Sequence, residues 1–520
     1  MRRSPLKPVR LAIAVVVLAG FTAALLDFRG LVPARVAHWL AAVQFTPSLL
    51  ALGSSLAAGL VLLVILGVTL AFGRVYCSTV CPLGLLQDGI ARLAAWLRPR
   101  RRSLPPAKPS HWLRYGMLVA CVLTIAGGAA SIAYAHADPY SIFGRIFSGI
   151  FRPLVVAANN GLVAPAQGLG QQWLYRVTTP WPGLGVLLPA GLALMVVAVL
   201  VLWRGRLYCN TLCPVGTVLG LLARHAAFRL TIDQSVCSKC TECLRSCKAQ
   251  CLDLRTSRID ASRCVACYNC IAACADHGIA YRFAWTRPKA PQPATSVVAL
   301  EPDRQRRALL AGALLLAPAV TLRAAESALP ALVVGPRPPA SPPGSLNVRR
   351  FVDRCTACQL CVSTCPTQVL QPAFLEYGFE GLAKPHLDFN RAFCNYDCRR
   401  CGEVCPNGAI TLLSLAEKRL SSVGVAKFDQ KRCIVDKDGT DCAACSEHCP
   451  TKAVFTVPFR TNLRLPKVNE ELCIGCGACE YACPVRPVRA ITVAARAEHA
   501  FAREPYDPPV AKPTTGDFAF

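Results

Sequence analysis

Hydrophobic residues gather in four long runs within the first two hundred positions of the chain. The runs cover about Leu11 to Leu26, Leu49 to Phe72, Tyr115 to Ala135 and Leu184 to Trp203. Each run approaches the roughly 20 residues that a helix needs to cross about 30 Å of hydrocarbon. The pattern predicts an α-helical membrane domain of four transmembrane helices at residues 1–232. A cleaved signal peptide is the competing interpretation of the first run, and the three later runs argue against it.

The basic residues between these runs predict the orientation of the helices. Four precede the first run, the segment from Arg74 to Arg114 carries eight, and the segment from Ala137 to Gly183 carries only three. Cytoplasmic loops of membrane proteins are enriched in Lys and Arg. We therefore expect a multi-pass membrane protein, with both ends of the helical domain in the cytoplasm.

A motif of twelve residues follows the second run and returns 132 positions later, after the fourth run. Gly73–Gly84 and Gly205–Gly216 share eight of their twelve residues, including Cys-x-x-x-Cys-Pro. This internal repeat predicts two related halves whose cysteines, Cys77, Cys81, Cys209 and Cys213, meet near a pseudo-twofold axis. A shared iron-sulfur or other metal site, a redox-active dithiol and a structural docking surface are three interpretations of the pattern.

Two closely spaced cysteine groups come next in the chain. They are Cys237, Cys240, Cys243 and Cys247, followed by Cys264, Cys267, Cys270 and Cys274. This is the bacterial ferredoxin spacing, in which the fourth cysteine of each group binds the cluster of the other group. The repeated spacing argues against zinc, and Cys251 is interpreted as a bystander thiol. We predict an α+β, ferredoxin-like domain with two clusters at residues 233–286, on the cytoplasmic side.

Residues 287–345 are rich in Pro, Ala and Arg, a composition that is typical of a linker. Within them, Arg304 to Leu310 and the uncharged stretch up to Leu322 resemble a twin-arginine export signal inside the chain. A helix that lies against the bilayer is the alternative interpretation. An export signal at this position predicts that the residues after it lie in the periplasm.

Four further cysteine groups occupy residues 346–520, and each of them ends in Cys-Pro. Their members are Cys355, Cys358, Cys361 and Cys365; Cys394, Cys398, Cys401 and Cys405; Cys433, Cys442, Cys445 and Cys449; and Cys473, Cys476, Cys479 and Cys483. Sixteen thiols in this register predict four [4Fe-4S] clusters, about six in the whole chain, rather than eight disulfides. We expect nested exchange, first group with fourth and second with third, and Gly475 and Gly477 to let backbone approach the inorganic sulfides.

Composition and charge agree with a membrane protein. Of the 520 residues, 53% are hydrophobic and 17% are charged, which excludes general disorder. The net charge is +27, and it divides into +24 for residues 1–345 (35 basic, 11 acidic) and +3 for residues 346–520 (22 basic, 19 acidic). The basic residues thus follow the membrane loops, and nucleic-acid binding is not expected.

On these motifs, residues 1 to about 286 resemble the NapH-type (MauN-type) membrane ferredoxins. Residues 304 to about 495 resemble the NapG-type (MauM-type) periplasmic polyferredoxins, so the chain looks like a fusion of the two families. The resemblance implies a quinol dehydrogenase of the bacterial inner membrane that takes electrons from the quinone pool. It also implies a periplasmic redox protein or multihaem cytochrome as the recipient, as in a nitrate-reductase-like system. An accessory polyferredoxin for assembling a respiratory metalloenzyme, and a scaffold that docks soluble redox proteins, are the rival functions.

Quinol releases two electrons, whereas each cluster accepts one. The membrane domain must therefore either hold a half-oxidised quinone or place the quinol beside two electron acceptors. Candidate proton-handling residues are Asp88, His111, His136 and Asp138. The sequence leaves one difficulty: about 30 Å of hydrocarbon separates the two cytoplasmic clusters from the four periplasmic ones, and the four repeated cysteines alone would not bridge it.

Overall fold

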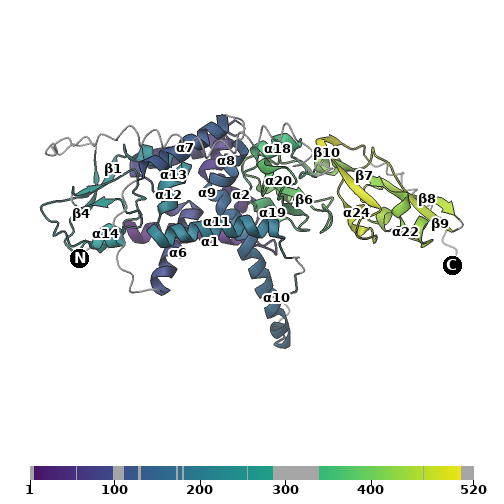
Figure 1. Cartoon of the computed structure of the whole chain (residues 1–520), viewed down its shortest axis with the longest axis horizontal. Coiled ribbons are helices and arrows are strands. Elements are labelled where there is room, and N and C mark those ends of the chain that lie inside the picture. The colour runs from purple at the N-terminus through teal and green to yellow at the C-terminus, as the bar shows by residue number, and fades with distance from the viewer. Residues whose placement is uncertain are drawn as a thin grey trace, which may run out of the picture.

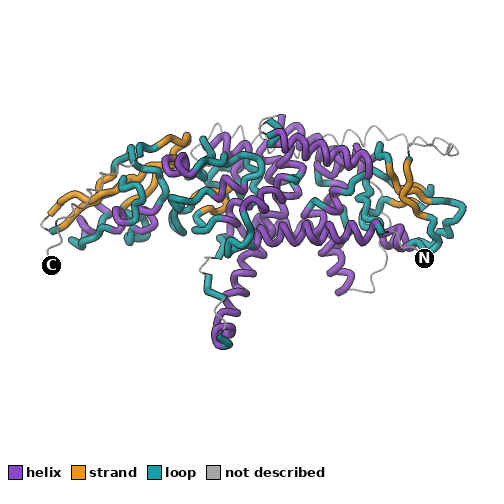
Figure 2. The backbone as a smooth tube through the Cα atoms, turned by 180° about the vertical axis from the view of Figure 1, so that it is seen from behind, coloured by secondary structure: helices purple, strands orange, loops and turns teal. Residues whose placement is uncertain are grey.

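The computed structural model describes residues 5–53, 55–97, 110–126, 130–170, 174–177, 181–254, 256–284, 339–460 and 462–504. The molecule is elongated, with a helical domain in the middle and one cysteine-rich domain at each end (Figure 1). Among the described residues, strands occur only in the two end domains (Figure 2). The twin-arginine-like segment lies outside the described residues.

The helical domain contains fourteen helical segments in the described part of the chain. They are α1 (Leu6–Leu26), α2 (Ala34–Ala42), α3 (Phe45–Leu50), α4 (Leu56–Phe72), α5 (Tyr76–Thr79), α6 (Pro82–Leu97), α7 (His111–Ala126), α8 (Ala130–Ala137), α9 (Pro139–Ile146), the π-helix η1 (Phe147–Phe151), α10 (Arg152–Gly168), α11 (Leu184–Arg204), α12 (Leu207–Thr211) and α13 (Pro214–Ala223).

Three helices in the described residues are long and apolar enough to cross a membrane: α1, α11 and the continuous helix Pro139–Gly168. The second predicted run is shorter than expected, because α3 and a turn occupy its first residues and α4 begins at Leu56. The third predicted run is described as two helices, α7 and α8. The helix Pro139–Gly168 was not among the expected spans, and its α10 end runs across the direction of α1 and α11 (Figure 1).

Large apolar side chains are exposed on the outer faces of the helical domain. Val16 of α1 is 71% exposed, Leu60 of α4 is 64% exposed and Leu192 of α11 is 58% exposed. Exposed apolar belts of this kind mark a surface that contacts lipid or another protein rather than water. The protein is therefore membrane-associated.

The first end domain consists of two small antiparallel sheets and two short helices. Its elements are β1 (Phe228–Ile232), α14 (Glu242–Ser246), β2 (Leu252–Asp253), β3 (Arg258–Ile259), α15 (Asn269–Ala273) and β4 (Ile279–Phe283). β1 pairs with β4 in the register Leu230 with Tyr281, and β2 pairs with β3. Because β1 completes this sheet, the domain begins before residue 233, the boundary that the sequence suggested.

The second end domain, the polyferredoxin domain, contains α18 (Val348–Arg354), α19 (Leu360–Thr364), β5 (Leu370–Pro372), η2 (Phe379–Gly381), β6 (Pro385–Leu387), α20 (Arg400–Val404), α21 (Leu415–Leu420), β7 (Ser421–Phe428), η3 (Gln430–Arg432), α22 (Ile434–Lys437), α23 (Ala444–Glu447), β8 (Val454–Arg460), β9 (Leu463–Val468), α24 (Ala478–Ala482) and β10 (Ile491–Phe501). Antiparallel pairs form between β5 and β6, β7 and β10, and β8 and β9.

The polyferredoxin domain also starts earlier than residue 346. The backbone N–H of Leu387 donates to Ala340 O at 2.8 Å, and that of Thr411 donates to Gly344 O at 2.9 Å. Residues 340–345 are buried. The proline-rich composition of this segment suggested a linker, but its backbone carbonyls pair with the domain and its side chains are part of the domain core.

The loops that carry the regularly spaced cysteines share a backbone conformation. The second and fourth residues after Cys237, Cys264, Cys355 and Cys473 all have positive φ, with values from +47° to +81°. Glycine occupies both positions only in the last of these loops, as Gly475 and Gly477. Both glycines also pack closely against the rest of the domain: a Cβ on Gly475 would lie 2.5 Å from Gly424 N, and one on Gly477 would overlap the ring of Phe389.

Candidate metal centres

The four thiols of the repeated motifs are buried together where the two halves of the helical domain meet. Cys77, Cys81, Cys209 and Cys213 are each at most 5% exposed. The thiols of Cys81 and Cys213 both lie close enough to those of Cys77 and Cys209 to interact with them electrostatically. We call this group the four-thiol site.

Two arginines of the same motifs hold the halves together reciprocally. Arg74 of the first copy donates from Nη2 to Cys209 O at 3.1 Å, and Arg206 of the second copy donates from Nη1 to Cys77 O at 2.5 Å. A Cβ on Gly84 would lie 3.0 Å from Arg206 Nη1, and one on Gly216 would lie 2.7 Å from Arg74 Nη2. The sequence repeat is therefore a structural repeat. Both arginines are identical in the two copies, which is the signal that could have singled them out.

Several donors point at the sulfur atoms of the four-thiol site. Gly216 N lies 3.2 Å from Cys213 Sγ, Gln87 Nε2 lies 3.3 Å from Cys209 Sγ, and Arg74 Nη2 lies 3.8 Å from Cys77 Sγ. Cys213 is also the N-cap residue of the ten-residue helix α13. Donors to sulfur and helix N-termini stabilise thiolates, which are the form that binds metal.

The charges around the four-thiol site fit an anionic centre. Arg74 and Arg206 are 0% and 1% exposed. Arg206 pairs with Asp88 at 2.8 Å, but among the ion pairs of the described residues none includes Arg74. A buried guanidinium without a carboxylate partner is costly unless another anion compensates for it. Four thiolates around a [4Fe-4S] cluster would supply that negative charge.

Asp88 is held in its ionised form by its neighbours. Lys248 Nζ lies 2.9 Å from its Oδ2, and Arg10 Nη1 lies 3.7 Å away. Burial by itself would raise the pKa of this carboxyl group, but Arg206 first and then Lys248 lower it to about 2. Asp88, which the sequence suggested as a proton-handling residue, therefore acts as a fixed counter-ion that joins the helical domain to the first end domain.

The first end domain packs directly against the four-thiol site. Arg74 Nη1 donates to Ser262 O at 3.1 Å, two residues before Cys264. The N–H of Arg206 donates to Lys248 O at 3.1 Å, next to Cys247. These two contacts place the loops of Cys247 and Cys264 beside the repeated motifs.

The eight cysteines of the first end domain form two groups. Cys270 lies within electrostatic range of Cys264, Cys267 and Cys247, and Cys243 lies within range of Cys237 and Cys240. Ser238 N donates to Asp276 Oδ2 at 3.2 Å, which brings the loop after Cys274 to the Cys237 group. Cys251 Sγ lies 3.7 Å from Cys247 Sγ, beside the group that faces the helical domain.

The sixteen cysteines of the polyferredoxin domain form four groups, by exchange between neighbours. Group A contains Cys355, Cys358 and Cys361 with Cys405; group B contains Cys394, Cys398 and Cys401 with Cys365; group C contains Cys433, Cys442 and Cys445 with Cys483; group D contains Cys473, Cys476 and Cys479 with Cys449. The nested exchange that the sequence suggested is wrong, because α19 packs on α20 and α23 packs on α24, making two compact two-group units.

These groups follow one another along the domain. The N–H of Cys394 in group B donates to Cys476 O in group D at 2.9 Å, so the two units meet there. Group A lies nearest the helical domain, and group C lies toward β8 and β9 at the far end (Figure 1).

Group A is docked on the helical domain through α9. A Cβ on Gly144 would overlap the backbone oxygen of Cys358, so only glycine permits this approach. Arg152 Nη2 donates to Ser363 O at 2.9 Å. The side chain of Tyr140, in the first turn of α9, lies beside the thiol of Cys358.

The four-thiol site and group A are joined by one short stretch of protein. Tyr208, which adjoins Cys209, donates from its hydroxyl to Ala137 O at 3.3 Å. Asp138 follows and caps α9 by accepting from Ser141 N at 2.8 Å. The polyferredoxin domain is therefore packed directly against the helical domain, close to the residues that lead to the four-thiol site.

The remaining proton-handling candidates are separated. Asp138 is 3% exposed and caps a helix. His136, in the last turn of α8, lies within range of Arg145 and Lys384 at the polyferredoxin side. His111 begins α7 at the opposite end of the helical domain. The structure does not bring them together into one site.

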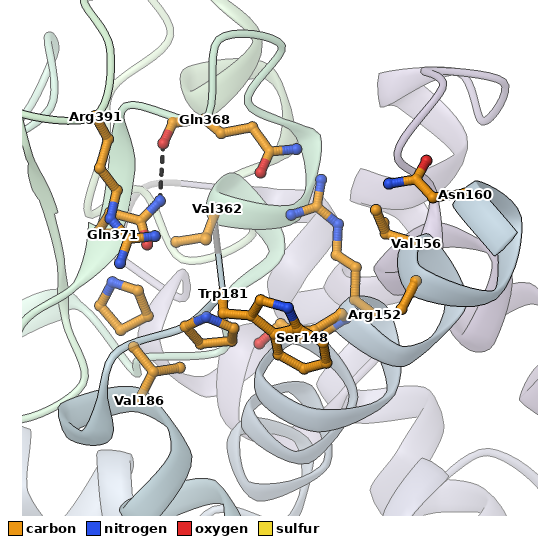
Figure 3. A pocket seen from close by; sticks show the side chains of 14 residues that line it. Ser148, Arg152, Val156, Asn160, Trp181, Val186, Val362, Gln368, Gln371 and Arg391 are labelled. Carbon is orange, nitrogen blue, oxygen red and sulfur yellow. Dashed lines mark hydrogen bonds between the residues drawn. The ribbon is translucent and has the colours of Figure 1, made fainter. Parts of the chain in front are cut away.

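A cavity of about 110 Å³ lies at the junction with the polyferredoxin domain (Figure 3). Arg152, Trp181 and Val186 approach it from the helical domain, and Gln371 and Arg391 from the polyferredoxin domain. Gln371 Nε2 donates to Gln368 O at 2.8 Å beside it. The cavity is small for a ring-sized ligand, since ligand pockets commonly measure about 300–1,000 Å³.

The donor sets suit clusters better than single metal ions. All 30 cysteines lie in the described residues, and none of them forms a disulfide. In the same residues no three His, Cys, Asp or Glu side chains are close enough to hold one metal ion. In a cluster the four thiolates bind different iron atoms and so stand farther apart than ligands of one zinc ion.

Comparison with protein families finds iron-sulfur domains along the chain. Models described as 4Fe-4S binding domain match residues 55–105 with 186–232, which contain the two repeated motifs, and residues 466–489. Models described as 4Fe-4S dicluster domain match residues 260–369 and 393–453. Each dicluster match spans two cysteine groups that the fold places in different domains or units. The first spans the groups that begin at Cys264 and Cys355, and the second spans those that begin at Cys394 and Cys433. The packing of the helices determines which cysteine groups pair. The spacing cannot, because nearly the same spacing recurs in every group along the chain.

Curated relatives match between a quarter and a third of the chain. "Ferredoxin-type protein NapF" of Escherichia coli K12 is 28% identical over 149 residues, 29% of this chain and 82% of the relative. "Ferredoxin-type protein NapG" of the same organism is 30% identical over 158 residues, 27% of this chain and 64% of the relative. "Methylamine utilization ferredoxin-type protein MauM" of Methylobacillus flagellatus is 31% identical over 154 residues, 27% of this chain and 62% of the relative. No solved structure matches the chain.

The fold, the cysteine groups and these matches define the class of the protein. It is a membrane-associated iron-sulfur protein built from 4Fe-4S ferredoxin modules and an apolar helical domain. More particularly, about 150 residues of the chain are similar to the ferredoxin-type proteins NapG and MauM, and its activity is electron transfer through 4Fe-4S clusters.

Proposed function

We propose that this chain takes electrons from quinol in the membrane and passes them through 4Fe-4S clusters to a periplasmic redox protein. Six clusters are assigned to the two groups of the first end domain and to groups A to D. A seventh is assigned to Cys77, Cys81, Cys209 and Cys213. The clusters would supply one-electron steps, and the three domains that carry their cysteines follow one another along the long axis of the molecule (Figure 1).

The observation that carries this proposal is the position of the four-thiol site. It contacts the loops of Cys247 and Cys264 through Arg206 and Arg74, and it reaches group A through Tyr208 and α9. A chain of donor and acceptor centres on both sides of a helical membrane domain is what electron transfer across a bilayer requires. In this proposal the first end domain is cytoplasmic, as the basic loops predict, and the polyferredoxin domain is periplasmic, as the twin-arginine-like segment predicts.

The recipient of the electrons is inferred from the relatives. NapG and MauM are ferredoxin-type proteins, and the full name of MauM refers to methylamine utilization. We propose a periplasmic redox enzyme system, such as a nitrate-reductase-like system, reached directly or through a multihaem cytochrome. Group C lies at the end of the polyferredoxin domain that faces away from the helical domain, and we expect electrons to leave the protein from there.

The test is anaerobic reduction of the intact protein in detergent. Menaquinol and ubiquinol analogues are added separately, and the clusters are followed by low-temperature EPR against a dithionite control. We expect quinol to reduce clusters of the polyferredoxin domain in the wild-type protein. Replacement of Cys209 by Ser should abolish that reduction and leave reduction by dithionite intact. Clusters that respond to dithionite but to neither quinol would contradict the proposal and favour an accessory polyferredoxin.

A further inference from the structure

A second cavity, of about 360 Å³, opens in the helical domain at the end that faces the first end domain. It lies between α7, the last turn of α11, α12 and the loop at Ala249 and Gln250, and its surface is mainly apolar. Its volume falls within the common range for small-molecule sites, unlike the 110 Å³ cavity at the other end.

Two of the segments that line this cavity belong to cysteine loops. Asn210, Thr211 and Leu212, which line one wall, are the three residues between Cys209 and Cys213 of the four-thiol site. Ala249 and Gln250 follow Cys247, and Arg263 immediately precedes Cys264. Asn210 Nδ2 donates to Ala249 O at 3.2 Å and so joins the two segments. A ligand here would lie beside two candidate clusters at once.

The lining suits an amphipathic ring with an apolar tail. Leu113, Leu200 and Trp203 form the side toward the outer face of the helices, where Trp203 is 58% exposed. The other lining side chains include the polar residues Asn210, Thr211 and Gln250, His111 at the start of α7, and the basic residues Arg114, Arg204 and Arg263. An aromatic headgroup with two hydroxyls would find hydrogen-bond partners inside and lipid outside.

A third cavity differs from the 360 Å³ cavity in the polarity of its surface. It measures about 640 Å³, lies against Cys365 and Cys398, and is lined by several charged side chains, among them Asp27, Arg152 and Arg400. Arginines also line the 360 Å³ cavity, but its surface is mainly apolar, whereas the surface of the 640 Å³ cavity is more polar than apolar and carries both acidic and basic side chains. Such a surface disfavours an apolar ring and tail, because its polar groups would lose water without gaining partners.

We propose that the 360 Å³ cavity binds the quinol headgroup and that the isoprenoid tail leaves past Leu113, Leu200 and Trp203 into the lipid. This inference rests on the proposed function. Quinol becomes quinone by losing two protons and two electrons. Clusters held by Cys247, Cys264, Cys267 and Cys270, and by the four-thiol site, would each accept one of these electrons. The protons leave at the cytoplasmic face, with His111 as the first acceptor. Two acceptors beside one headgroup satisfy the requirement set by a two-electron donor.

Photolabelling tests the cavity without relying on electron transfer. The intact protein in detergent is illuminated with an azidoquinone analogue, and the labelled peptides are identified by mass spectrometry. We expect label on residues 110–114 and 200–212, displaced by unlabelled quinone but not by a phospholipid without a quinone ring. Label on the residues around Asp27 and Arg400, or displacement by lipid alone, would overturn the assignment.

Matched variants provide the second arm of the test. Leu200→Trp fills the cavity, whereas Val199→Trp adds the same side chain at the neighbouring position, which is 56% exposed to the outside. We expect Leu200→Trp to lower labelling and quinol-driven cluster reduction at least tenfold, with reduction by dithionite unchanged, and Val199→Trp to resemble the wild type. Equal behaviour of the two variants would overturn the site while leaving the proposed function standing. A wild-type protein that quinol never reduces would instead overturn the proposed function.

Discussion

A membrane potential should change how far quinol reduces the polyferredoxin domain. The proposed quinol cavity lies at the C-terminal end of α11, where Trp203 lines it. At the other end of α11, a Cβ on Gly185 would lie 2.9 Å from Phe374 of the polyferredoxin domain. An electron that passes beyond group A into the polyferredoxin domain therefore moves from the level of one end of this helix to the level of the other. Its 21 residues span about 31 Å, which is close to the full thickness of the hydrocarbon.

The size of the effect follows from this distance. One electron that crosses the whole potential gains about 2.3 kcal/mol per 100 mV. Since about 1.4 kcal/mol corresponds to a factor of ten, the ratio of reduced to oxidised clusters should change by about 50-fold for each 100 mV of membrane potential. The sign is set by the electron's negative charge: a potential that is positive on the polyferredoxin side should increase the reduced fraction.

The assay uses proteoliposomes with a fixed quinol to quinone ratio. A potassium gradient and valinomycin set the potential, and samples are frozen for EPR of the polyferredoxin clusters. As a control, dithionite added on the polyferredoxin side should reduce them independently of the potential. If the quinol-driven ratio changes by less than about twofold, donor and acceptor lie on the same side of the membrane, and the 360 Å³ cavity is not the electron donor site.

Three further predictions concern the junctions and the charges. Gly144→Ala should weaken docking of the polyferredoxin domain by about 1–3 kcal/mol, which would be measured as faster limited proteolysis between the domains. The control is Gly161→Ala on the same long helix, where a Cβ would meet open space, and this variant should behave as the wild type. Arg74→Met should remove about 1.5–3 kcal/mol of stabilisation from the reduced four-thiol cluster, lowering its midpoint potential by about 65–130 mV in an EPR titration; an unchanged potential would refute the counter-charge role. Burial lowers the pKa of His499 to about 4, below its unfolded value of about 6.5, so its contribution to stability is present above pH 6.5 and is lost as the pH falls toward 4. Thermal unfolding of His499→Gln should lack that part of the pH dependence, and an identical profile would contradict the assignment.

The sequence by itself determined the chemistry of this protein. The spacing of the cysteines defines ferredoxin loops because each loop closes within about ten residues, and its backbone conformation is set locally. The positive φ values at Lys239, Ala266 and Ala357 show the same loop with different residues at the same position. The twelve-residue repeat likewise implied two related halves, since matching residues in matching places fold alike. The apolar runs indicated the membrane, because length and composition suffice for that.

Only the tertiary structure decided which loops meet. Exchange between neighbouring cysteine groups depends on how α19 packs on α20 and α23 on α24, and nothing in the spacing distinguishes that from nested exchange. The meeting of Arg74 with Cys209, across 135 positions, depends on the contact between the two halves. The docking of Cys358 on Gly144 depends on a missing side chain in a helix that the apolar runs did not indicate. Such contacts join surfaces that are distant in the chain, and local pattern carries no information about which distant surface fits.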